Sequence, residues 1–176
     1  MTAYSPVLGE SETAPTFGAE WLITRTRGAL YVSVDQANIN AVSAVFDPTA
    51  EGSVRAVEVD KLRRVSFAAL MFPKRFGRVR PYAGLGASLN LIGDAFPLVT
   101  AEEDEVTDGV YERIEDRRSQ ASLLAMGGVQ VQMGRAALFG QASFMPANSR
   151  FLLDDALAFF ELGVRYNFGG AREGIR

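Results

Sequence analysis

Residues 156–168 read Ala-Leu-Ala-Phe-Phe-Glu-Leu-Gly-Val-Arg-Tyr-Asn-Phe, and apolar residues alternate here with polar or small ones. Every second residue from Ala158 to Phe168 is apolar. The positions between them hold Glu161, Gly163, Arg165 and Asn167. Successive side chains of a strand point to opposite faces, so this pattern predicts a β-strand with one apolar and one polar face. Such a strand suits the edge of a soluble sheet or the wall of a membrane barrel.

The end of this stretch also resembles a known signal. A polar residue, Glu161, is followed at fixed spacing by a glycine and two aromatic residues. This order is similar to the carboxy-terminal signal that the barrel-assembly machinery of Gram-negative bacteria reads on the last strand of outer-membrane β-barrels. The resemblance implies a small outer-membrane barrel whose assembly signal comprises Glu161, Gly163, Tyr166 and Phe168. The chain departs from the family pattern in its tail, residues 169–176, which we expect to lie in the periplasm.

Further stretches with this alternation occur throughout the chain, although the first of them, Thr2 to Leu8, shows it only weakly. They are Thr2 to Leu8, Thr16 to Thr26, Ala29 to Phe46, a stretch that starts between Ser53 and Leu62 and ends before Pro73, Arg80 to Ile92, Arg118 to Met133, and Arg135 to Pro146. Between Gln36 and Asn40 the alternation is lost, which predicts a β-bulge or a twist. With the last strand these stretches make eight, and an even number is the rule for bacterial barrels. An alternative division splits Ala29 to Phe46 in two and leaves the first residues as a tail; we favour the single long strand.

The connections between these strands alternate in length. Arg27-Gly28, residues 73–78 and Gly134 are short turns, whereas 47–53, 93–117 and 147–155 are longer. Outer-membrane barrels have short periplasmic turns and long external loops. We therefore expect an all-β fold, an eight-stranded antiparallel up-and-down transmembrane β-barrel that forms a single domain over residues 1–176.

The composition excludes several classes of protein. The 176 residues include no cysteine and no histidine, and 18 basic against 21 acidic residues give a net charge of −3. Thiolate chemistry and the commonest general base are therefore missing, and no basic surface indicates nucleic-acid binding. No stretch approaches the roughly 18 consecutive apolar residues of a transmembrane helix. The first residues do not match a signal peptide, so we expect any such peptide to have been removed.

Charged residues on the predicted polar faces are the main candidates for a functional site. They are Glu20, Asp35, Arg64, Glu161 and Arg165. In a narrow barrel all five would point into the lumen, where unpaired charges cost several kcal/mol each, so we expect them to pair across it. They could line an ion path or form a structural plug. We favour the plug, because eight strands leave an interior only wide enough for side chains.

Two other groups of residues have competing interpretations. The acidic run Glu102 to Glu105, with the mixed charges that follow to Arg118, could bind divalent cations or lipopolysaccharide, but a solvated external loop is the simpler explanation. Ten aromatic residues lie mainly near predicted strand ends and could form membrane-interface girdles. They are Trp21, Phe67, Phe72, Phe76, Tyr82, Phe144, Phe159, Phe160, Tyr166 and Phe168.

The expected function is non-enzymatic. We expect no catalytic residues, cofactor or metal, and a monomeric barrel without an open pore that supports envelope integrity or displays loops for surface interactions. The resemblance implies outer-membrane lipid, lipopolysaccharide and the barrel-assembly machinery as partners. The alternative is a soluble calycin-like barrel that binds a small hydrophobic ligand. That alternative places the apolar faces inside and puts Glu161 and Arg165 on the surface.

Overall fold

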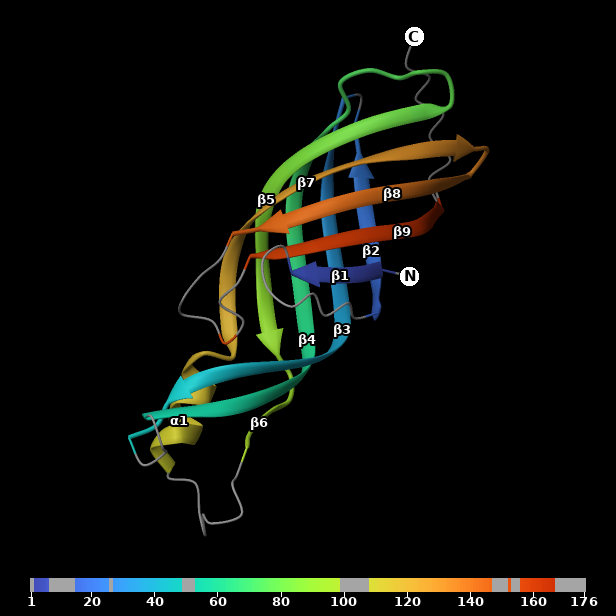
Figure 1. The fold of residues 1–176 in the computed structure, drawn as a ribbon. Coiled ribbons are helices and arrows are strands. Elements are labelled where there is room, and N and C mark those ends of the chain that lie inside the picture. Colours follow the sequence, from blue (N-terminus) through green and yellow to red (C-terminus); the bar gives the residue numbers. More distant parts are fainter. Residues whose placement is uncertain are drawn as a thin grey trace.

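The chain folds into one antiparallel, strongly curled sheet (Figure 1). In this computed structural model the described residues are 2–6, 15–25, 27–48, 53–98, 108–146, 152 and 156–166. The elements are β1 (Thr2–Pro6), β2 (Pro15–Thr24), β3 (Gly28–Phe46), β4 (Val54–Met71), β5 (Val79–Ile92), β6 (Ala95–Pro97), α1 (Asp108–Asp116), β7 (Ser119–Met133), β8 (Ala136–Met145) and β9 (Leu157–Tyr166). The predicted all-β class is therefore confirmed.

The strand order is β3-β2-β1-β9-β8-β7-β5-β4-β6. β3 also pairs with β4. The succession of paired strands from β3 through β2, β1, β9, β8, β7 and β5 to β4 therefore leads back to β3. Residues 28–46 form one strand, as we favoured, and the register of β3 against β4 shifts between Asn38 and Ala41, which confirms the predicted irregularity. The short strand β1 joins β2 to β9.

The apolar faces of the strands point outward. In β5, Leu85 is 73% exposed and Leu89 is also exposed, whereas Ser88 and Asn90 are buried. The same division holds in β7, where Leu123 is exposed and Gln130 is buried. The calycin-like alternative requires the opposite orientation, and Glu161, which would then lie on the surface, is buried. That alternative is wrong about the direction of the faces.

Small inward residues let neighbouring strands approach closely. A Cβ atom at Gly86 would lie 1.9 Å from the carbonyl oxygen of Phe67, and one at Gly128 would lie 2.4 Å from the carbonyl oxygen of Gly140. A backbone oxygen in a sheet cannot rotate away as a side chain can. Glycine at these two positions therefore allows the pairing of β4 with β5 and of β7 with β8.

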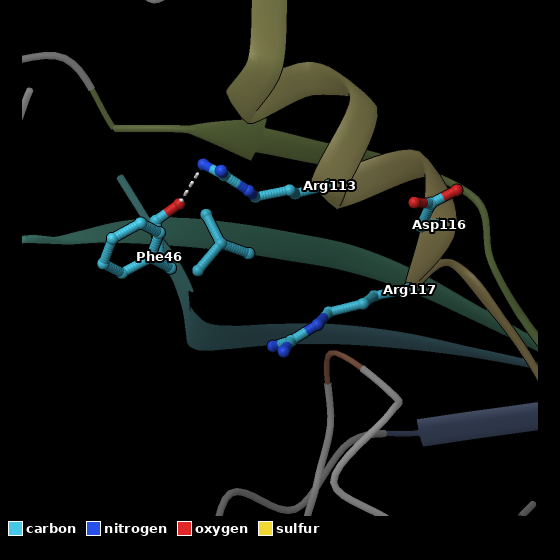
Figure 2. Close-up of a pocket in the computed structure, with 5 residues that line it drawn as sticks. Phe46, Arg113, Asp116 and Arg117 are labelled. Atoms are coloured by element: carbon cyan, nitrogen blue, oxygen red, sulfur yellow. Dashed lines mark hydrogen bonds between the residues drawn. The ribbon is translucent and has the colours of Figure 1, made fainter. Parts of the chain in front are cut away.

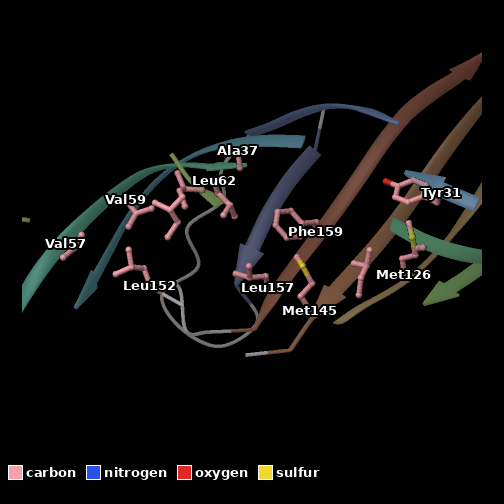
Figure 3. Close-up of a cluster of buried hydrophobic side chains, with 14 of the residues drawn as sticks. Tyr31, Ala37, Val57, Val59, Leu62, Met126, Met145, Leu152, Leu157 and Phe159 are labelled. Carbon is pink, nitrogen blue, oxygen red and sulfur yellow. The ribbon is translucent and has the colours of Figure 1, made fainter. Parts of the chain in front are cut away.

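Buried apolar side chains continue beyond the polar part of the interior. Tyr31, Met126 and Phe159 belong to the same cluster as Val57 and Val59, which lie in the outer part of β4 (Figure 3). There β3 and β4 extend past the other strands and project, together with β6 and α1, at one end of the sheet (Figure 1). The hairpin is therefore packed by a continuation of the same core, to which α1 contributes Val110 and Ile114.

The helix α1 corrects the sequence prediction. The stretch 93–117 is not an irregular solvated loop throughout, because it contains β6 and α1. Val110 and Ile114 lie four residues apart, on one face of the helix, and both are buried. Two apolar positions are too few to show a helical period, and so short a helix depends on packing for its stability. Glu102 to Glu105 lie outside the described residues. Within the described part of the chain, no helix is long and apolar enough to span a membrane.

The aromatic residues divide into two groups. Trp21, Phe67, Phe76, Phe144, Phe160 and Tyr166 are exposed, as a girdle requires. Phe72, Tyr82 and Phe159 are buried, so the girdle interpretation is wrong for these three. The reason is the alternation of the strands, because Tyr82 and Phe159 stand on the inward faces of β5 and β9, where arginine side chains cover their rings. Phe168 lies outside the described residues.

Candidate functional site

The interior of the curled sheet holds the five charged residues that the alternation placed there. Arg64 of β4 stands opposite Asp35 of β3 in the register, and its Nη2 lies 3.0 Å from Asp35 Oδ2. The same guanidinium also binds the carboxylate of Glu161, which comes from β9. Its Cζ lies 3.9 Å from the ring centroid of Phe159. With Arg64 only 3% exposed, this is a buried cation shared by two carboxylates.

A second group forms around Arg165. The Nε and Nη2 atoms of Arg165 donate to the carboxylate of Glu20 at 2.5 and 3.2 Å. Arg165 also donates to Gln130 at 3.1 Å and to Gln141 at 2.9 Å, and its Cζ lies 3.9 Å from the ring centroid of Phe139. Arg165 also donates to the hydroxyl of Tyr82, so this guanidinium is held by one carboxylate, two amides, one hydroxyl and two aromatic rings.

Gln141 of β8 joins the two groups. Its Oε1 accepts from Arg165 and, at 2.8 Å, from the hydroxyl of Tyr82. Its Nε2 donates to Tyr31 Oη at 3.1 Å and to the carboxylate of Glu161. A continuous set of hydrogen bonds thus runs from Glu20 to Asp35. We call this set, with both arginine groups, the interior network.

Sequence reasoning did not find the uncharged members of the interior network. The alternation of the stretch from Arg135 to Pro146 puts Gln141 on a polar face, but nothing in the sequence shows that it contacts both arginine groups. Tyr82 was assigned to the membrane interface, because aromatic residues near strand ends are common there. Tyr82 lies an even number of residues from Ser88 and Asn90, so it shares their inward face of β5. This spacing is the signal that could have corrected the assignment.

The interior network is well satisfied. Among the described residues, Thr16 Oγ1 is the one buried side-chain oxygen or nitrogen without a hydrogen-bond partner. Within the same residues, no group of three or more acidic side chains is arranged to hold a metal ion. Buried charges that are paired and fully hydrogen-bonded hold the strands that carry them in one arrangement. The geometry thus suits cross-linking of the sheet through its interior.

A polar layer lies where the projecting hairpin leaves the rest of the sheet. Lys61 Nζ lies 2.5 Å from Asp94 Oδ2, and both side chains are partly exposed. The hydrogen bond from Lys61 lowers the pKa of the Asp94 carboxyl below its ordinary value. On the outer face of β4, Arg63 Nε donates to Gln36 Oε1 at 3.3 Å. Charged and amide groups therefore separate the apolar face of the sheet from the projecting hairpin.

A pocket of about 230 Å³ lies on the projecting hairpin. It is lined by Val45 and Phe46 at the end of β3 and by Arg113, Asp116 and Arg117 at the end of α1 (Figure 2). Arg113 Nη1 donates to the carbonyl oxygen of Phe46 at 2.9 Å. We call this the outer pocket.

The residues of the proposed assembly signal occupy different environments. Glu161 lies in the interior network, and Tyr166 is exposed at the end of β9. Gly163 stands opposite Phe139, and a Cβ atom on it would lie 2.6 Å from Phe139 Cε1. The ring of Phe139 therefore fills the space that a side chain at Gly163 would occupy. Phe168 lies outside the described residues.

Comparison with known proteins decides the type of fold. No protein-family model matches the chain, and no curated protein sequence matches it. Among solved structures, the chain matches Ail, the attachment invasion locus protein of Yersinia pestis, which was solved in complex with the heparin analogue sucrose octasulfate. The match has a TM-score of 0.51 and 15% sequence identity, and it covers 94% of this chain and 90% of Ail. The fold is that of an outer-membrane β-barrel. In an outer-membrane barrel, the outward apolar face meets lipid and the polar face lines the interior.

Proposed function

We propose that the chain is a non-enzymatic integral outer-membrane protein with a closed polar interior and an outer end that makes surface interactions. The orientation of its two faces carries this proposal. Large apolar side chains such as Leu85, Leu123 and Leu162 are more than two-thirds exposed, while the charged residues lie inside. In water so large an apolar surface favours aggregation, whereas in a bilayer it is the lipid-facing wall of an eight-stranded barrel.

The connections give the proposed barrel a direction. The β2–β3, β4–β5 and β7–β8 turns are short and lie at one end, where β1 begins and β9 ends. The β5–β7 connection, which contains β6 and α1, and the β8–β9 connection are longer and lie at the other end, where β3 and β4 are joined by a connection as long as the β4–β5 turn. By the usual rule the short turns face the periplasm. The barrel would then form a single domain over residues 1–176, with the 169–176 tail in the periplasm and the hairpin outside.

The proposed partners follow from this direction. Outer-membrane lipid would surround the apolar wall, and Arg63 and Lys61 in the polar layer would meet the phosphates of lipopolysaccharide. The barrel-assembly machinery would read the last strand at Glu161, Gly163, Tyr166 and Phe168. We propose a monomer, because in a closed barrel every strand edge is paired.

A surface role is supported by the outer end of the molecule. The hairpin of β3 and β4 packs against α1 and β6 around buried side chains such as Val57, Val59 and Val110, so it holds a defined shape. Ail, which shares the fold, was crystallised with a sulfated sugar. A rigid outer hairpin suits recognition of an external ligand or partner, because little conformational entropy is lost on binding.

Folding into lipid tests the proposed location. Urea-unfolded protein diluted into phospholipid vesicles should become rich in β-structure by circular dichroism. Unboiled samples should then migrate differently from boiled ones on a gel. The same dilution into plain buffer is the control and should give aggregate. A monomeric folded protein in buffer without detergent would refute the membrane proposal.

The proposed closed interior predicts that the protein does not conduct ions. In this proposal Arg64 and Arg165 with their partners block the interior, so the folded protein in planar bilayers should show no stable conductance steps. A pore-forming porin serves as the positive control. Regular single-channel steps from the wild-type protein would contradict a closed interior and favour the ion-path interpretation.

A further inference from the structure

We infer that the outer pocket binds an acidic sugar unit, a pyranose ring that carries one sulfate or carboxylate group. This inference rests on the proposed function, since it requires the hairpin to face the outside of the cell. It concerns the five residues that line the pocket, and it is independent of the interior network. Three features of the pocket lead to this ligand class.

The first feature is a cation that has no partner among the described residues. Arg113 is held by the carbonyl of Phe46, and Arg118 is held by Glu115 at 2.8 Å. The guanidinium of Arg117, by contrast, forms no hydrogen bond or ion pair with the described part of the chain, and it is half-buried. Figure 2 shows Arg113 and Arg117 extending from the end of the helix toward the same side as Phe46. A guanidinium presents paired N–H donors that match sulfate or carboxylate oxygens.

The second feature is an apolar wall. Val45 and Phe46 line the pocket beside the cations, and Phe46 is 55% exposed. The Cζ atom of Arg113 lies 5.1 Å from the centroid of that ring, so Arg113 orients the aromatic side chain as well as adding charge. A simple inorganic anion has no apolar part to place against this wall, whereas a sugar ring has C–H faces.

The third feature is the carboxylate of Asp116, which also lines the pocket. It repels a bare anion, but it can accept hydrogen bonds from hydroxyl groups. A ligand with an anionic group for Arg117 and hydroxyls for Asp116 satisfies both. The size limits the ligand further, because 230 Å³ lies below the roughly 300–1,000 Å³ of drug-sized pockets. It suits about one sugar ring.

Calorimetric titration of the full chain, folded in detergent micelles, tests this inference. The probes are glucose 6-sulfate, glucuronate, glucose and inorganic sulfate. We expect at least one of the two acidic sugars to bind at least tenfold more tightly than glucose or sulfate. The two acidic sugars distinguish a sulfate site from a carboxylate site.

Variants locate the binding site. Arg117→Ala should weaken binding of the acidic sugar at least tenfold, and Arg117→Lys should weaken it less, because it keeps the charge but loses the paired donors. Asp116→Asn should raise the affinity for inorganic sulfate relative to the sugar. The matched control is Arg135→Ala, which removes an exposed arginine from the β7–β8 turn at the opposite end and should change the affinity less than twofold. Gel mobility of unboiled samples shows that each variant is folded.

Three results would overturn the inference. The first is that neither acidic sugar binds. The second is that inorganic sulfate binds as tightly as the acidic sugars. The third is that Arg117→Ala and Arg135→Ala weaken binding of the acidic sugar equally. Failure of the membrane proposal gives a different result, a protein that folds in plain buffer. A chain that folds only into lipid yet binds no acidic sugar would therefore refute the pocket and leave the proposed function standing.

Discussion

Replacing Arg64 with alanine should destabilise the folded protein by about 3–5 kcal/mol. The guanidinium is buried and contacts the carboxylates of Asp35 and Glu161. Its removal leaves two negative charges in the interior with no cation between them. The effect is measured by urea unfolding of the protein in lipid vesicles, followed by gel mobility and circular dichroism.

The neighbouring residue provides the matched control. Arg63 points outward and is exposed, and within the described part of the chain its side chain donates to the amide of Gln36 alone, so Arg63→Ala should change the stability by no more than about 0.5 kcal/mol. A triple variant with Arg64→Met, Asp35→Asn and Glu161→Gln should recover much of the loss, because it removes the charges together. Equal unfolding midpoints for the Arg63 and Arg64 variants would show that the interior network does not stabilise the fold.

Replacing Leu85 with arginine should destabilise the membrane-inserted protein by about 2–4 kcal/mol. Leu85 is 73% exposed near the middle of β5, and its neighbours across the strands are Ala69 and Ala125, so little packing is lost. Almost the whole effect should come from placing a cation in the hydrocarbon. The measurement is the free energy of unfolding from vesicles.

Val42→Arg is the control for this substitution. Val42 is 67% exposed on the projecting part of β3, outside the proposed hydrocarbon layer. Its replacement should cost much less, because the arginine stays in water. If the two arginines have the same small effect, the outward face of β5 does not contact lipid, and the membrane proposal fails.

Much of the fold follows from local patterns. The alternation in each stretch places Leu85 and Leu123 on apolar faces and Glu161 on a polar face. In the structure the two leucines point outward and Glu161 is buried. The lost alternation near Asn38 predicted the register shift. The helix α1 escaped detection, since Val110 and Ile114 alone give no recognisable period. The interface prediction is wrong for Tyr82 and Phe159, because it rests on their aromatic side chains and not on their alternating position along the strand, which faces inward.

Neighbours along the chain set which residues share a face and where the shortest turns lie, so the sequence predicts both properties. The contact of Arg64 with Glu161, 97 positions away, and the link that Gln141 makes between the two arginine groups are visible in the folded sheet alone. The outer pocket is likewise invisible in the sequence, since it needs the end of β3 beside the end of α1. The physical reason is that such contacts depend on the curl and stagger of the whole sheet, which arise from all the strand pairings together.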